Sequence, residues 1–285
     1  MTSKPLTELP FEIAGSAGKP IRGDVRLATE GLPKGIIVFC HGLKGFKDWG
    51  GWPYLMRTLS QQGFVTIAFN LSHGGIGDVP DQFTELELFK QNTYARERED
   101  LRCVLNAVRQ GALPGISQHK SLPVCLLGHS RGGAGVLCVG SERDDVSAIC
   151  TLASVSSLGK VPPELERRWR SEGVRYIENS RTKQKLPMGI PLLDEILNDR
   201  GIIETATRNL KQPLLVVHGT ADEAVSYTAA EAIVSWAPNA QLLRLDGVDH
   251  VFGMKHPFSI EMAAPDGALN RVVREISKFV TAVCE

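Results

Sequence analysis

The chain has 285 residues, of which 42% are hydrophobic and 22% are charged, and its 32 basic residues balance its 32 acidic residues. These values are typical of a globular protein in water, and the zero net charge argues against nucleic-acid binding, which requires a surplus of Lys and Arg. The sequence gives no sign of a membrane anchor either, because its longest apolar runs fall well short of the roughly 20 residues that span a bilayer.

The N-terminal residues and the cysteines indicate a cytoplasmic protein. The segment 1–8 has no apolar run of the kind that secretory signal peptides contain. The six cysteines are widely spaced and form no CxxC pair, and we expect them to be reduced, mostly buried thiols instead of disulfides or metal ligands. A mature form from which a signal peptide has been removed is the alternative.

Predicted strands and helices alternate along most of the chain. Short apolar runs rich in β-branched residues predict strands at 21–27, 35–40, 64–70, 122–127, 146–152, 213–217 and 241–245. Longer segments with a helical spacing of apolar residues predict helices at 52–61, 94–110, 131–141, 228–237 and 270–283. The alternation predicts an α/β fold with a mostly parallel sheet covered by helices on both faces. In such sheets the active site lies beyond the carboxyl ends of the strands.

One long segment, 156–212, interrupts the alternation and is expected to contain no strand. Its part from 160 to 185 carries eight basic and four acidic residues, a local charge of +4. Roughly 56 residues is too long for an ordinary loop, and the apolar residues at 192, 193, 196 and 197 favour an ordered helix. We therefore expect a single domain over 1–285 with a cap or lid insertion at 156–212. Its basic run either forms a solvated face or attracts a carboxylate-bearing substrate.

The segment after the predicted strand 122–127 carries a candidate nucleophile. It reads Gly128-His129-Ser130-Arg131-Gly132 and leads into a helix of small residues. A serine on so tight a strand-to-helix turn has a strained backbone, and its neighbours two positions away must be small, a demand that glycine meets on both sides. The turn lifts the Ser130 hydroxyl above the sheet edge at the positive end of the helix. The alternative is a glycine-rich packing turn with an incidental serine.

A serine hydroxyl needs a base, and the base needs a carboxylate that orients it. On a strand-turn-helix elbow these groups follow in the chain order Ser, Asp or Glu, His. Asp222 follows the predicted strand 213–217, and His250 follows 241–245; they lie 92 and a further 28 residues beyond Ser130. We therefore predict a catalytic group of Ser130, Asp222 and His250. The alternative carboxylates are Glu223, Asp246 and Asp249.

The other histidines receive different expectations. His129 lies inside the turn and is expected to pack or hydrogen-bond beneath it, and His218 is expected to support the loop of Asp222. His256 precedes a proline and is expected at the surface. His41 and His73 each follow a predicted strand and are candidate substrate-binding residues. No two histidines have the HxxxH spacing of a zinc helix, so no metal site is expected.

An acyl-transfer enzyme also needs donors for the oxyanion. The elbow supplies the backbone N–H of Arg131, and the second donor is expected from the loop after an early strand. That loop begins His41-Gly42-Leu43 directly after the predicted strand 35–40, so we expect the N–H of Leu43 to point into the site. The alternative is that His41-Gly42 merely ends the strand. Three nearby aromatic residues either frame an acyl pocket or belong to the core: Trp49, Trp52 and Tyr54.

Together these motifs resemble those of the α/β-hydrolase superfamily over nearly the whole chain, from about 21 to 283. Within it the sequence is similar to bacterial feruloyl- and cinnamoyl-esterases, to dienelactone-hydrolase-like proteins and to related serine peptidases. The resemblance implies an eight-stranded, mostly parallel sheet, a lid and no cofactor. It also implies Ser130 as nucleophile, His250 as base, Asp222 as its partner, and amide donors at Leu43 and Arg131. Dienelactone hydrolases use a Cys nucleophile, whereas this elbow has Ser.

The expected function is hydrolysis of a small-molecule ester through an acyl-enzyme. A peptidase or amidase acting through the same groups is the first alternative, and a non-catalytic binding protein that kept the fold is the second. No nucleic-acid or membrane partner is expected. The oligomeric state stays open, with a homodimer as one option.

Overall fold

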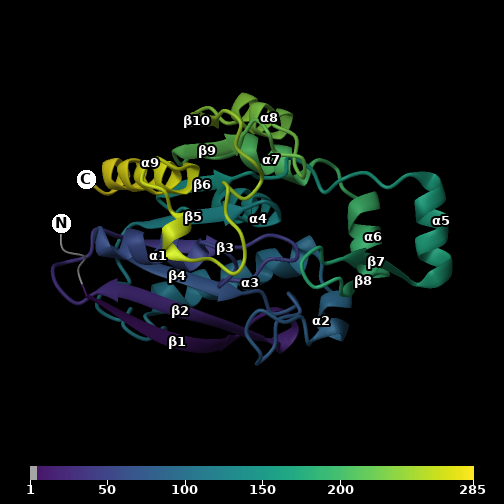
Figure 1. Ribbon diagram of the computed structural model, residues 1–285, viewed down its shortest axis with the longest axis horizontal. Coiled ribbons are helices and arrows are strands. Elements are labelled where there is room, and N and C mark those ends of the chain that lie inside the picture. Colours follow the sequence, from purple (N-terminus) through teal and green to yellow (C-terminus); the bar gives the residue numbers. More distant parts are fainter. Residues whose placement is uncertain (1–4) are drawn as a thin grey trace.

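The computed structural model describes residues 5–285, and its centre is one sheet of eight strands (Figure 1). They lie side by side in the order β1-β2-β4-β3-β5-β6-β9-β10. The bounds are β1 Leu6–Ala14, β2 Pro20–Ala28, β3 Gly35–Cys40, β4 Phe64–Asn70, β5 Val124–His129, β6 Ala148–Leu152, β9 Leu214–Gly219 and β10 Ala240–Leu245. The pairs β1/β2 and β2/β4 are antiparallel, and all pairs from β4 to β10 are parallel. The predicted α/β architecture is confirmed.

Helices cover both faces of the sheet, which explains why its central strands are continuous apolar runs. On one face, α1 (Trp52–Gln61) and α9 (Ala268–Cys284) pack over one hydrophobic cluster. On the other, α3 (Tyr94–Gln110), α4 (Arg131–Ser141) and α8 (Thr228–Trp236) pack over a second cluster. Neighbouring side chains of β5 point to opposite clusters, Leu126 to the second and Leu127 to the first. The five predicted helices are all present.

The first strand, β1, was not predicted from the sequence. It pairs antiparallel with β2 at the edge of the sheet. Its alternation is visible in Leu9, Phe11 and Ile13, but acidic residues and Pro10 interrupt it. Proline is tolerated here because an edge strand leaves one row of backbone groups unpaired.

The insertion contains two strands, which corrects the expectation that 156–212 has none. β7 (Val174–Glu178) and β8 (Lys185–Gly189) form a separate antiparallel hairpin, packed against α5 (Pro163–Glu172) and α6 (Ile190–Leu197). These four elements lie together at one end of the molecule, next to α2 (Leu86–Lys90) (Figure 1). The remaining helix of the segment, α7 (Ile202–Arg208), packs on α4 of the main body. We therefore use "cap" for residues 163–197 only.

A carboxylate of the cap joins it to the main body. Glu195 on α6 accepts hydrogen bonds from the backbone N–H groups of Tyr94 and Ala95, at 2.6 and 2.7 Å, in the first turn of α3. It also lies 3.6 Å from Arg98. Negative charge at a helix N-terminus satisfies free N–H groups and interacts favourably with the helix dipole. This contact holds the cap in a defined position over the end of the sheet.

The six cysteines are all free thiols, and four of them are buried: Cys40, Cys125, Cys138 and Cys150. Within residues 5–285 no helix combines the length and the apolar character needed to cross a bilayer.

Candidate active site

Ser130 occupies a strained turn between β5 and α4. Its φ is +55° and its ψ is −117°, a backbone conformation that residues other than glycine rarely adopt. The turn fits only because glycines flank it: a Cβ on Gly128 would collide with the carbonyl oxygen of Gly132, and one on Gly132 with that of Cys40. The turn is held by the Ser130 N–H, which donates to the Leu152 carbonyl at 2.8 Å. The sequence motif therefore has the backbone geometry expected of a nucleophile elbow.

Asp222 and His250 form a hydrogen-bonded pair. Nδ1 of His250 donates to Oδ2 of Asp222 at 2.7 Å. The other oxygen, Oδ1, accepts from the backbone N–H groups of Ala224 and Val225 at 2.9 and 2.8 Å. His218 supports the same loop, with Nε2 3.0 Å from the Val225 carbonyl and 3.2 Å from Oδ2. The Asp222 carboxylate is thus fully buried, accepts three hydrogen bonds and has the His218 ring beside it.

Ser130 and His250 line the same pocket, together with His129. Nε2 of His129 donates to the backbone carbonyl of His250 at 3.0 Å, and the two rings lie 4.7 Å apart between centroids. His129 therefore packs and hydrogen-bonds beneath the site, as its place in the turn indicates. Over the described residues 5–285 no hydrogen bond joins Ser130 Oγ to His250, and such contacts often tighten only when substrate binds.

The loop after β3 lies directly against the nucleophile. A turn closes where the Gly45 N–H donates to the Gly42 carbonyl at 3.0 Å, and Leu43, inside this turn, lines the pocket. A Cβ on Gly42 would lie 2.8 Å from the Cβ of Ser130 and 3.3 Å from the backbone N of Arg131. Only glycine permits this approach, which places the loop and the start of α4 on the same side of Ser130.

The side chain of Arg131 forms a buried ion pair that sequence reasoning missed. Its Nε donates to Glu97 on α3 at 2.7 Å, and both side chains are almost completely buried. Asn92 donates to the other oxygen of Glu97 at 2.7 Å, and the guanidinium lies 3.8 Å above the ring of Tyr94. Burial raises the pKa of Glu97, against the opposing charge of Arg131. This pair ties the first residue of α4 to α3 and so supports the elbow from below.

Neither of the two candidate substrate-binding histidines reaches the pocket. His41 is buried behind the loop; its Nδ1 donates to the Gly42 carbonyl at 2.9 Å and its Nε2 accepts from the Leu71 N–H at 3.3 Å. His73 is buried between Ser72, at 2.8 Å, and Arg96, at 2.9 Å. Both positions follow strands, but the ring of each turns inward to satisfy buried polar groups.

His256 was expected at the surface, and the structure places it in the pocket wall. Its ring stacks on Trp49 with 6.2 Å between centroids, and its Nδ1 accepts from the Gly50 N–H at 2.9 Å.

The alternative carboxylates lie elsewhere: Asp246 pairs with Arg244 at 2.7 Å, and Asp249 accepts from the backbone N–H of Gly253 at 2.7 Å.

The pocket itself has a volume of about 480 Å³ and lies between the main body and the cap. The loop after β3, the elbow and the loop of His250 form its floor. The turn between β7 and β8 forms its roof, through Asn179, Ser180 and Arg181. Of the three aromatic residues in question, Trp49 and Trp52 line the pocket. Tyr54 instead donates to Asn270 at 2.8 Å, away from it.

Comparison with known proteins agrees with this fold. Residues 37–259 match the model of the alpha/beta hydrolase family, which is more than half of the chain. The chain therefore belongs to the alpha/beta hydrolase family, and the resemblance seen in the sequence is confirmed. No curated protein matches the sequence significantly.

Solved structures of low sequence identity share the fold. Est1E from Butyrivibrio proteoclasticus is 18% identical with a TM-score of 0.68, covering 96% of this chain and 98% of its own. An esterase domain from Rhodothermus marinus is 19% identical with a TM-score of 0.63, covering 99% and 100%. A dienelactone hydrolase from Anabaena variabilis is 17% identical with a TM-score of 0.63, covering 96% of each chain. Est1E has also been solved with ferulic acid bound.

The buried histidines predict that acid destabilises the fold. Burial lowers the pKa of His41 and of His73 to about 4 and that of His129 to about 3. Between pH 6.5 and 4 these residues take up protons only when the chain unfolds, so each lowers the free energy of unfolding by about 1.4 kcal/mol per pH unit. Burial raises the pKa of Asp100 to about 6, and this carboxyl opposes the trend between about pH 4 and 6, where the folded state holds its proton.

Glu97, whose pKa burial also raises, opposes the histidines in the same way as Asp100. The expected net effect is therefore a loss of at most about 3 kcal/mol per pH unit between pH 6 and 4. Urea unfolding at pH 7.5, 6.0, 5.0 and 4.5 measures it. His73→Gln keeps a hydrogen-bond acceptor for Arg96 but removes one titrating imidazole. It should therefore reduce the pH dependence of the free energy of unfolding by about 1.4 kcal/mol per pH unit. A free energy of unfolding that is constant or rises toward pH 4.5 contradicts this prediction.

Proposed function

We propose that this protein is a serine hydrolase that cleaves small-molecule carboxylic esters through an acyl-enzyme on Ser130. The observation that carries the proposal is the pair of His250 and a fully buried Asp222, 2.7 Å apart, in the same pocket as a serine on a strained elbow. The esterases among the structures that share the fold support it. The free thiols support a reducing compartment such as the cytoplasm.

In the proposed reaction, Nε2 of His250 accepts the proton of Ser130 Oγ as Oγ attacks the ester carbonyl carbon. Asp222 holds the Nδ1–H of the imidazole and stabilises the positive charge that forms on it. The backbone N–H groups of Leu43 and Arg131 donate to the oxyanion of the tetrahedral intermediate. His250 then protonates the leaving alcohol, and the acyl group remains on Ser130. Water, deprotonated by His250, attacks this acyl-enzyme and releases the acid.

The test is covalent labelling together with turnover. Purified protein should release p-nitrophenol from short-chain p-nitrophenyl esters, with an initial burst equal to the enzyme concentration where deacylation is slow. A fluorophosphonate should stop turnover, and peptide mass spectrometry should locate the label on Ser130. A label on another residue, or labelling without ester turnover, contradicts the proposal. Faster cleavage of aminoacyl p-nitroanilides than of esters would instead identify a peptidase or amidase.

A further inference from the structure

We infer that the substrate carries a carboxylate, recognised by three cationic side chains at the mouth of the Ser130 pocket; this inference rests on the proposed function. The three cations are Lys44, Arg181 and Lys255. They come from three separate segments: the loop after β3, the turn between β7 and β8 in the cap, and the loop that follows His250. No Asp or Glu is among the described residues that line this pocket.

None of the three cations has a carboxylate partner among the described residues, whereas three basic residues of the cap do. These three pair within the cap: Arg168 with Glu172 at 2.8 Å, Arg170 with Glu166 at 3.0 Å, and Lys183 with Glu178 at 3.0 Å. These pairs are exposed to solvent, and none of their residues lines the Ser130 pocket.

At the pocket mouth, by contrast, the positive charge is not neutralised. Arg181 donates to the backbone carbonyl of Asp81 at 2.7 Å, and Lys44 Nζ lies 3.4 Å from the backbone carbonyl of Glu178. Lys255 has no hydrogen bond or ion pair to any residue in 5–285. The Asp81 carboxylate lies outside the pocket lining, 3.6 Å from Nε2 of His256. An anionic group entering the pocket would thus meet ammonium and guanidinium groups that still have free donors.

The positive charge of Arg181 also affects the pKa of a residue in the pocket wall, His256. Burial, followed by the positive charge of Arg181, lowers the pKa of His256. His256 is therefore neutral near pH 7 and adds no charge of its own. Asp81 and Asp48 act on His256 in the opposite direction, from outside the pocket lining. The charged side chains of the lining itself are the three cations, and the apolar surfaces of Trp49 and Trp52 lie in the same pocket.

The loop after β3 places Lys44 next to the proposed oxyanion donor. Lys44 has a φ of +60° and is the third residue of the turn that Gly42 and Gly45 close. That position of a turn favours glycine, because a side chain there is strained. Lys44 directly follows Leu43, the proposed oxyanion donor, and both residues line the pocket.

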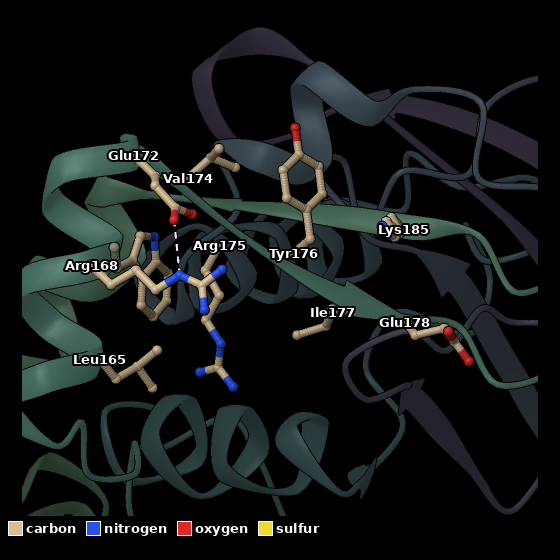
Figure 2. Close-up of a pocket in the computed structure, with 10 residues that line it drawn as sticks. Leu165, Arg168, Glu172, Val174, Arg175, Tyr176, Ile177, Glu178 and Lys185 are labelled. Carbon is tan, nitrogen blue, oxygen red and sulfur yellow. Dashed lines mark hydrogen bonds and ion pairs between the residues drawn. The ribbon is translucent and has the colours of Figure 1, made fainter.

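A second cavity, in the cap, is lined by both basic and acidic residues. It has a volume of about 380 Å³ and lies between α5 and the hairpin (Figure 2). Its basic residues are mixed with Glu172 and Glu178, and Glu172 is paired with Arg168. The Ser130 pocket differs from this cavity in that its lining has basic residues and no Asp or Glu.

The experiment compares esters that differ only in charge. One pair places the carboxylate in the acyl part: mono(4-nitrophenyl) adipate against 4-nitrophenyl hexanoate. The other places it in the alcohol part: 4-acetoxybenzoate against its methyl ester. For at least one pair, kcat/KM at low ionic strength should be tenfold or more higher for the anionic ester, and 0.5 M NaCl should remove most of this preference.

Two variants locate the preference. Lys44→Gln combined with Lys255→Gln should bring the anionic-to-neutral ratio of kcat/KM close to 1, and Lys255→Glu should favour the neutral ester. Lys183→Gln removes a cap lysine that is paired with Glu178 outside the pocket, and it should keep the native ratio. Thermal melting confirms that each variant is folded.

The outcomes separate this inference from the proposed function. Hydrolysis of the neutral esters with equal or greater kcat/KM than the anionic ones overturns the carboxylate preference and leaves the serine hydrolase intact. A preference that persists in the double lysine variant overturns the role of these side chains. Absence of both turnover and fluorophosphonate labelling overturns the proposed function itself, and the inference with it.

Discussion

Replacing Ser130 with alanine is expected to lower kcat for ester hydrolysis by about four to six orders of magnitude. In the proposed mechanism the substitution removes the only atom that forms the covalent bond to the acyl group, and it leaves the proposed oxyanion donors and the pocket in place. The residual rate is measured as p-nitrophenol release in stopped assays with excess enzyme. Fluorophosphonate labelling should disappear in the same variant.

The fold should survive this change, because Ser130 Oγ has no hydrogen-bond partner among residues 5–285 and the turn is held by backbone contacts. Unfolding by urea should therefore give a free energy within about 1 kcal/mol of the native value. Ser171→Ala, the same substitution on the exposed side of α5, serves as control and should keep native kcat. Native activity in Ser130→Ala would refute the nucleophile.

The positions of Ser130, Asp222 and His250 could be predicted because each depends on local signals. A glycine-flanked serine after an apolar strand specifies an elbow, and the other two residues each follow a recognisable strand. The carboxyl ends of parallel strands meet at one edge of the sheet, so the topology alone brings the three segments together. No comparable local rule governs which way a loop histidine turns. His41 and His73 point inward because buried backbone and side-chain groups there need hydrogen-bond partners.

The ion pair of Arg131 and Glu97 was missed although the sequence carries a signal for it. Glu97 lies four residues before Leu101 and seven before Val104, on the stripe of α3 that packs into the core. A carboxylate on an apolar stripe must be paired or protonated when the helix packs, so a buried partner was predictable. That the partner is the residue after Ser130 depends on how α3 and α4 pack, which no local pattern specifies.

The hairpin of the cap was missed for a different reason. The strands β7 and β8 have five residues each, and β7 is exposed at Tyr176 and Glu178. The two strands form a small sheet that is half exposed to solvent, and they carry charged residues. Their alternation of apolar and polar residues is therefore weak. The hairpin matters for function because its turn presents Arg181 to the pocket.

Replacing Asp222 with asparagine is expected to lower kcat by about 10⁴ while the fold is kept. Oδ1 accepts two backbone N–H groups, so the amide oxygen of asparagine would take that place. The amide NH₂ would then face Nδ1 of His250 where Oδ2 now stands. Nδ1 could accept but no longer donate, so the imidazole proton would move to Nε2. In that tautomer His250 cannot take the proton of Ser130.

Asp249→Asn separates orientation of the base from a general effect of lost charge. Asp249 is one residue from His250, but its carboxylate accepts from the backbone N–H groups of Val251 and Gly253, at 3.2 and 2.7 Å. An asparagine oxygen can accept the same bonds, so kcat should fall less than tenfold. Measurement of kcat for both variants on one p-nitrophenyl ester decides between the two carboxylates. A larger loss in Asp249→Asn would assign the orienting role to Asp249, and the 2.7 Å contact of Asp222 would then be structural.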